Sequence, residues 1–184
     1  RFRSTVELAE VEQRLAATRP RGCVLPHALS DRGQISYQFL LDFGSFRDLQ
    51  RHRNGVVRMP LLTARHGFEE WYLRELGPLE QEGRALVKTQ RAAVDQLPCD
   101  PVTKQYYVGL GFRVACHVTF GLPAAVYVME LRSSKTVHPT LRARVHQMIA
   151  AFREVFPDVA LHVDADPDDW TIRRGGQTIW RLCT

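Results

Sequence analysis

The chain has 184 residues, of which 45% are hydrophobic and 24% are charged, and its net charge is +5. This length suits one domain with a substantial core, and no apolar run approaches the roughly 18 residues of a membrane span. The composition is that of a soluble globular protein, and the scattered arginines lack the continuous basic stripe with interleaved aromatics of a nucleic-acid interface. We therefore expect a single domain over residues 1–184, with no membrane and no nucleic-acid partner.

The cysteines and the start of the chain give further expectations. The four cysteines lie far apart and form no Cys-x-x-Cys pair, so we expect free thiols in a reducing cytoplasm and no zinc site; they are Cys23, Cys99, Cys116 and Cys183. The acidic run at residues 164–169 lacks the glycine and the closing Glu of a calcium loop, which predicts a solvated turn. The sequence opens on Arg1 without a signal peptide, so we expect the domain to be excised from a longer chain.

Two elements are predicted in the first third of the chain. Residues 5–17 carry apolar side chains at helical spacing, which predicts a surface helix. Residues 34–43 alternate apolar and polar side chains, which predicts a half-buried strand. The apolar positions of this alternation are Ile35, Tyr37, Phe39, Leu41 and Phe43. We expect Ser45 to cap a short helix that carries residues 51–53 at its end.

The rest of the chain predicts a mixture of helices and strands, and therefore an α+β fold. The expected elements are helices over residues 67–97 with a break at Gly77-Pro78, a strand over 112–120, a helix over 139–156, a strand over 159–163 and a hairpin over 170–182 around Gly175-Gly176. The aromatic side chains Phe68, Trp71 and Tyr72 share one helix face, for which core packing is favoured over a flavin-stacking platform. His117, in the strand over 112–120, is expected to be structural.

The run Arg51-His52-Arg53 is the first candidate site, because two guanidinium forks beside an imidazole can grip a phosphate. The alternative interpretation is a solvated helix end whose cations interact with the helix carbonyls. A second candidate lies where His138 caps a helix that begins at Pro139, because its backbone N–H groups would face an anion beside Arg142.

Two blocks resemble one known family. The segment Phe46-Arg47-Asp48-Leu49-Gln50-Arg51-His52-Arg53, after an aromatic strand, resembles the signature region of the flavin-dependent thymidylate synthases. The later blocks Glu130-Leu131-Arg132 and His138-Pro139-Thr140-Leu141-Arg142 resemble that family's Asn/Glu-Leu-Arg element and the helix after it. The similarity extends over roughly residues 24–157, and the first block is the more specific.

The resemblance implies a mixed helix and sheet fold, a tetramer with sites between subunits, and a flavin chemistry. In that chemistry NADPH reduces FAD, methylenetetrahydrofolate supplies a one-carbon unit, and deoxyuridylate is methylated, while the protein binds and orients. The implied cofactor-binding side chains are Arg51, His52, Arg53, Arg132 and His138. Arg142 would bind the nucleotide substrate, and no residue is assigned to catalysis.

One part of the family signature is missing. Where the family has a Ser, a Glu, a second Ser and an Arg, the corresponding positions are Val56, Met59, Leu61 and Thr63. These side chains cannot replace the lost donors and acceptors, because unpaired polar atoms on a ligand cost a few kcal/mol each. One expectation is therefore a homo-oligomer with reduced or altered methyltransferase activity.

Two other interpretations remain open. The chain could be a non-catalytic half whose apolar residues 56–62 pack against a catalytic partner domain of similar fold. It could also be a nucleotide-binding enzyme with an altered substrate.

Overall fold

The computed structural model describes residues 5–169, 171–174 and 177–180. The chain forms two compact units, which we call the terminal unit (residues 1–36, 54–56 and 119–184) and the central unit (37–53 and 57–118). Both units draw on strands β1 and β3. Helices and short strands are mixed in both, so the fold class is α+β, as the sequence predicts.

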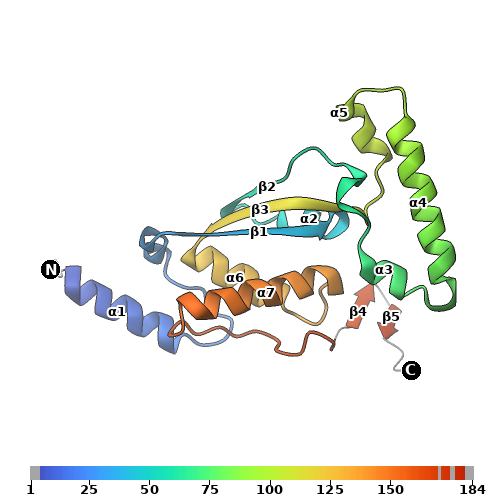
Figure 1. Cartoon of the computed structure of the whole chain (residues 1–184). Helices are drawn as coiled ribbons and strands as arrows, with labels where there is room; N and C mark the ends of the chain where they lie inside the picture. Colours follow the sequence, from blue (N-terminus) through green and yellow to red (C-terminus); the bar gives the residue numbers. More distant parts are fainter. Residues whose placement is uncertain (1–4, 170, 175–176, 181–184) are drawn as a thin grey trace. The chain divides into compact units, whose positions relative to one another are not determined.

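The elements follow one another along the chain as Figure 1 labels them. The α-helices are α1 (Thr5–Thr18), α2 (Phe43–Leu49), α3 (Glu70–Arg74), α4 (Glu80–Gln96), α5 (Pro101–Lys104), α6 (Leu122–Arg132) and α7 (Pro139–Val155). The short 3-10 helices are η1 (His27–Arg32), η2 (Ala64–His66), η3 (Gly77–Leu79) and η4 (Gln105–Tyr107). The strands are β1 (Gln34–Asp42), β2 (Gly55–Arg58), β3 (Arg113–Gly121), β4 (Thr171–Arg174) and β5 (Gln177–Trp180).

Strands β1, β3 and β2 form one sheet in that order, so β3 is central and β1 and β2 are its edges. The predicted period of two is confirmed in β3, where Val114, Cys116 and Val118 are buried and the residues between them are half-buried. It is confirmed in the first part of β1, where Ile35 and Tyr37 are half-buried between exposed neighbours, but at the end of the strand Leu41 and Asp42 are both buried. Phe43, predicted to lie in the strand, instead begins α2. One face of each strand is therefore more shielded than the other.

The predicted C-terminal hairpin is confirmed. Strands β4 and β5 pair antiparallel, with Thr171 opposite Trp180 and Arg174 opposite Gln177. Gly175 and Gly176, around which the hairpin was predicted, lie outside the described residues, as does Cys183.

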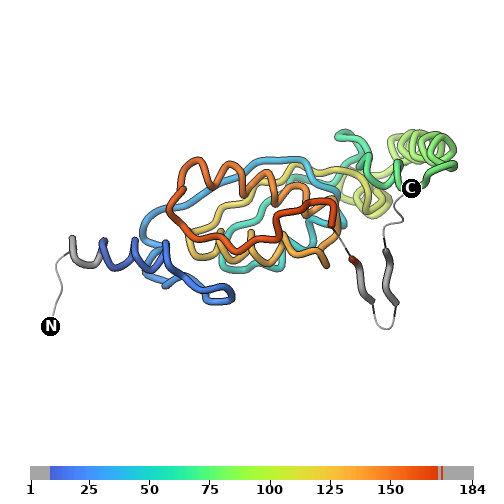
Figure 2. Tube along the Cα trace, turned by 90° about the horizontal axis from the view of Figure 1, so that it is seen from below, coloured from blue at the N-terminus to red at the C-terminus, as the bar shows by residue number. Residues whose placement is uncertain are grey.

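In the terminal unit α6 and α7 pack against each other (Figure 1). The predicted helix over 139–156 is confirmed as α7, and its buried stripe consists of Leu141, Val145, Met148, Ile149 and Phe152. The sequence did not predict α6, because its apolar side chains lie almost all around the helix and leave no stripe. After α7 the chain runs back along it, as Figure 2 shows for the segment at residues 157–169.

The predicted strand over 159–163 is wrong. This segment contains no strand, and its backbone bonds to separate partners: the Ala160 N–H donates to the Ala16 carbonyl at 2.9 Å, and the His162 N–H donates to Glu130 Oε1 at 2.8 Å. A short, largely apolar segment forms a strand only where a neighbouring strand can pair with it.

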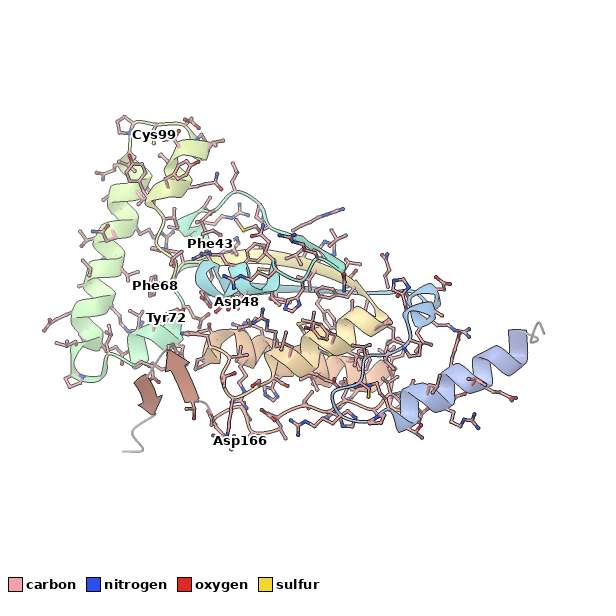
Figure 3. The ribbon with its side chains drawn as sticks, turned by 180° about the vertical axis from the view of Figure 1, so that it is seen from behind. Phe43, Asp48, Phe68, Tyr72, Cys99 and Asp166 are labelled. Carbon is pink, nitrogen blue, oxygen red and sulfur yellow. The ribbon has the colours of Figure 1, made fainter. Side chains whose placement is uncertain are left out.

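In the central unit the predicted helical region breaks as expected at Gly77-Pro78, where η3 separates α3 from α4. Phe68 lies against Phe112, with ring centroids 5.2 Å apart, and against Tyr72 at 6.0 Å (Figure 3). Phe68 lies before α3, in a β-bridge with Phe112, which corrects the expectation that it shares a helix face with Trp71 and Tyr72. The ring contacts nevertheless favour the core-packing interpretation of these aromatic side chains. Within the described residues, each helix is too short or too polar to cross a membrane.

Candidate anion-binding site

Helix α2 holds the first candidate site in place through a buried cap. Asp42, at the end of β1, is fully buried, and its Oδ2 accepts the Ser45 N–H at 2.9 Å and the Tyr72 hydroxyl at 3.1 Å. Asp42 rather than Ser45 is therefore the N-cap, which corrects the sequence prediction. The helix begins at Phe43, one turn earlier than a Ser45 cap would allow.

The inner side of α2 is apolar. Phe46 and Leu49 are buried to 1% and 0% exposure, and the Phe43 and Phe46 rings are stacked 6.4 Å apart. The helix ends at Leu49, where the Gln50 N–H donates to the Phe46 carbonyl and the His52 N–H to the Leu49 carbonyl, both at 3.0 Å. Residues 51–53 therefore form a turn after α2, which corrects the expectation that they end the helix.

We call Arg51, His52 and Arg53 the basic turn. Both arginines are exposed and His52 is half-buried. Arg51 Nε lies 3.8 Å from Asp48 Oδ1, and the two side chains are 71% and 38% exposed. Such an exposed pair contributes about 0–1 kcal/mol, so an incoming anion can compete with Asp48 for Arg51. The turn thus offers two cationic forks on an anchored backbone.

The segment around the basic turn is cationic as well. Residues 47–58 contain the arginines Arg47, Arg51, Arg53 and Arg58 against the single acid Asp48. All four arginines are exposed. The local field therefore favours anions and is screened by salt.

Arg142, which was predicted to bind the substrate, instead binds backbone carbonyls of the chain. Its side chain is 1% exposed, and its Nε donates to the Ser133 carbonyl at 2.7 Å. Its Nη atoms donate to the carbonyls of Asp166, Pro167 and Asp169. Arg142 thus fastens segment 157–169 to α7, and a nucleotide could reach it only by displacing these bonds.

The other two predicted ligands belong, like Arg142, to the terminal unit. His138 is the N-cap of α7 as predicted, and its Nδ1 lies 3.4 Å from the Thr140 N and 2.9 Å from Thr140 Oγ1. Arg132 is half-buried in the last turn of α6, where a cation interacts favourably with the helix dipole. The basic turn belongs to the central unit, so a common cleft for all these residues stays a prediction.

The positions that depart from the family signature form strand β2 and the loop after it. Val56 and Leu61 are each 47% exposed, whereas Leu62 is buried. The segment 56–62 thus presents apolar side chains on an edge strand and in the loop that follows it. Strand β2 was not predicted, because its four residues are too few to show alternation.

Two titratable groups in the central unit are poor catalysts at neutral pH. Burial raises the pKa of the Cys116 thiol to about 12, and the nearby Asp42 carboxylate adds to the shift. Burial also raises the pKa of Tyr37 to about 12. Both therefore stay protonated, and neither provides an ionised nucleophile or base. In the described part of the chain, no three His, Cys, Asp or Glu side chains cluster as metal ligands would.

Comparison with known proteins gives two relatives and no activity. No protein-family model matches the chain. A UPF0159 protein of Chlamydia pneumoniae is 28% identical over 112 residues, which cover 59% of this chain and 21% of the relative. A UPF0159 protein of Thermoplasma acidophilum is 29% identical over 137 residues, covering 67% of this chain and 26% of the relative. The chain thus matches about a fifth to a quarter of the length of these proteins.

Proposed function

We propose that the chain is a flavin-dependent thymidylate synthase-like domain whose basic turn holds the phosphates of FAD beside a pyrimidine nucleotide. The observation that carries the proposal is the pair of exposed guanidinium groups, Arg51 and Arg53, flanking His52 on a turn anchored by buried Phe46 and Leu49. Arginine forks bind phosphate bidentately, and a fixed backbone lowers the entropy lost on binding. NADPH and methylenetetrahydrofolate are the co-substrates where turnover occurs.

We further propose that methylation of deoxyuridylate by this chain alone is very slow or absent. Val56, Met59 and Leu61 stand where the family signature has polar ligand contacts. The guanidinium group of Arg142 donates its hydrogen bonds to backbone carbonyls inside the terminal unit. We therefore expect anion binding to persist without catalysis, since the basic turn depends neither on the missing signature residues nor on Arg142.

A second candidate is a non-catalytic half that packs on a catalytic partner domain. Two observations favour it. Exposed apolar side chains lie on edge strand β2 (Val56) and in the loop after it (Leu61), and both relatives are longer than this chain. Unpaired edges and apolar patches are typical of surfaces that another chain or domain covers. In this case the partner supplies the reacting groups.

FAD titration followed by flavin fluorescence tests the leading proposal. We expect the wild type to bind FAD, and Arg53→Ala to weaken binding by about ten- to a hundredfold, because a charge-assisted contact is lost. The matched control is Arg91→Ala, which removes an exposed arginine from α4. Equal affinities for wild type and Arg53→Ala would overturn the assignment.

A turnover assay with deoxyuridylate, methylenetetrahydrofolate, NADPH and FAD separates the two candidates from a full enzyme. Both predict little or no thymidylate from the isolated chain. Rapid turnover would show that other side chains have taken over the roles of the missing signature residues. FAD binding without turnover fits the leading proposal. The absence of both FAD binding and turnover fits the non-catalytic half.

A further inference from the structure

A hollow of about 580 Å³ lies over strands β1, β3 and β2 within the central unit. Its lining includes Gln38, Leu40, Arg58, Met59, Ala115 and His117. This volume falls within the roughly 300–1,000 Å³ of small-molecule sites, which combine an apolar floor with a few polar groups. The hollow contains no residue of the basic turn.

A hydrogen bond between β1 and β3 identifies the side chains of these strands that lie on the same face of the sheet. The hydroxyls of Ser36 on β1 and Thr119 on β3 lie 2.8 Å apart, which marks the face they share. Since side chains alternate along a strand, Gln38 is on the face of Ser36, and His117 is on the face of Thr119. The opposite face of β3 carries the buried Val114, Cys116 and Val118.

Strand β2 places Arg58 on this face too. A Cβ atom on Gly55 would lie 2.1 Å from Phe120 Cδ1, so Gly55 looks toward the buried face to which Phe120 belongs. Alternation then puts Val57 with Gly55, and Val56 and Arg58 on the other face. The exposure of Val56 and Arg58 agrees with this assignment. Arg58 and Gln38 therefore stand on the two edge strands, with His117 on the strand between them.

We propose that this hollow binds a small organic anion with an apolar body. Arg58 supplies a permanent cationic fork, while His117 and Gln38 supply hydrogen bonds to the anionic group. Leu40, Met59 and Ala115 form an apolar floor on which the body of the ligand lies. His117, expected from the sequence to be structural, is thus a ligand-binding residue. The inference is independent of flavin binding, since the two sites share no side chain.

Phenyl phosphate is a suitable probe, because it joins a dianion to an apolar ring. We expect titration of the full chain, followed by two-dimensional amide NMR, to shift the signals of residues 38–40, 58–59 and 115–117. Inorganic phosphate lacks the ring and benzyl alcohol lacks the charge, so each should bind at least about tenfold more weakly. Shifts confined to residues 51–53, or equal affinity for inorganic phosphate, would overturn the proposal.

Three variants make the test specific. Arg58→Gln should weaken phenyl phosphate binding by about tenfold or more, because the fork is lost. Ala115→Leu should also weaken it, because the larger side chain fills the floor and leaves Arg58 intact. Arg53→Ala should change FAD affinity alone, so a failure here is distinguishable from a failure of the proposed function. Unchanged binding in Arg58→Gln, or equal loss in Arg53→Ala, would contradict the site.

Discussion

At the scale of single residues, Arg142 shows how a charged side chain can be misassigned from sequence. Its position near the start of a helix predicted a ligand contact, but its carbonyl partners at Asp166, Pro167 and Asp169 lie 24–27 residues further along the chain. No local sequence pattern predicts hydrogen bonds between residues so far apart in the chain. The identity of Arg51 and Arg53 as exposed cations, by contrast, was readable from the sequence.

Arg142→Met should destabilise the protein by about 2–3 kcal/mol, because the long stem stays but several carbonyls lose their donor. Urea unfolding measures the change. Arg153→Met, an exposed position near the end of α7, is the matched control and should stay within about 0.5 kcal/mol of the wild type. An equal effect of both substitutions would show that Arg142 holds nothing together.

His146 predicts a pH dependence of stability. Burial lowers its pKa, and the charges of Arg142 and Arg153 lower it further, while Asp164 and Asp166 act in the opposite direction. Its Nε2 is buried and has no hydrogen-bond partner among the described residues. The unfolded chain therefore takes up a proton more readily, so the free energy of unfolding falls as the pH drops below the unfolded pKa of about 6.5.

Urea unfolding between about pH 8 and pH 5.5 checks this expectation, since that window contains the ordinary histidine pKa. His146→Gln removes the titrating ring, so its stability should fall less over the same range. An identical fall in the wild type and the variant would assign the pH dependence to other groups.

At the scale of elements, the long and strongly periodic ones could be predicted from the sequence. Strands β1 and β3 showed alternation, and α7 showed an apolar stripe. Helix α6 showed no stripe because it is buried on several sides, and β2 was too short. The sheet order, which builds the hollow around His117, depends on long-range pairing that no local pattern contains.

The substitution Gly55→Ala tests the packing of β2, because Gly55 allows β2 to lie close to β3. A Cβ atom there would lie 2.1 Å from Phe120 Cδ1 and 2.7 Å from the Thr119 carbonyl oxygen. We expect Gly55→Ala to cost about 1–3 kcal/mol through overpacking. Gly109→Ala, where the nearest atom is 3.8 Å away, should be nearly neutral. A neutral Gly55→Ala in urea unfolding would contradict the described packing of β2.

At the scale of the whole molecule, we expect the apolar segment 56–62 to be covered by a second copy or by a similar domain. Sedimentation should show self-association of the wild type at micromolar concentration. Val56→Lys should weaken it, because a charge would be buried in the contact. Leu86→Lys, which changes an exposed apolar residue of α4, is the control. A compact monomer with segment 56–62 exposed would contradict this expectation.

Equilibrium dialysis against FAD and riboflavin tests whether the basic turn binds the phosphates of FAD. Riboflavin has the same ring system and no phosphate, so we predict that the protein retains FAD well above riboflavin. The Arg51→Ala/Arg53→Ala double variant should lose this preference, whereas Arg91→Ala should keep it. Equal retention of FAD and riboflavin, or an unchanged preference in the double variant, would contradict phosphate binding by the basic turn.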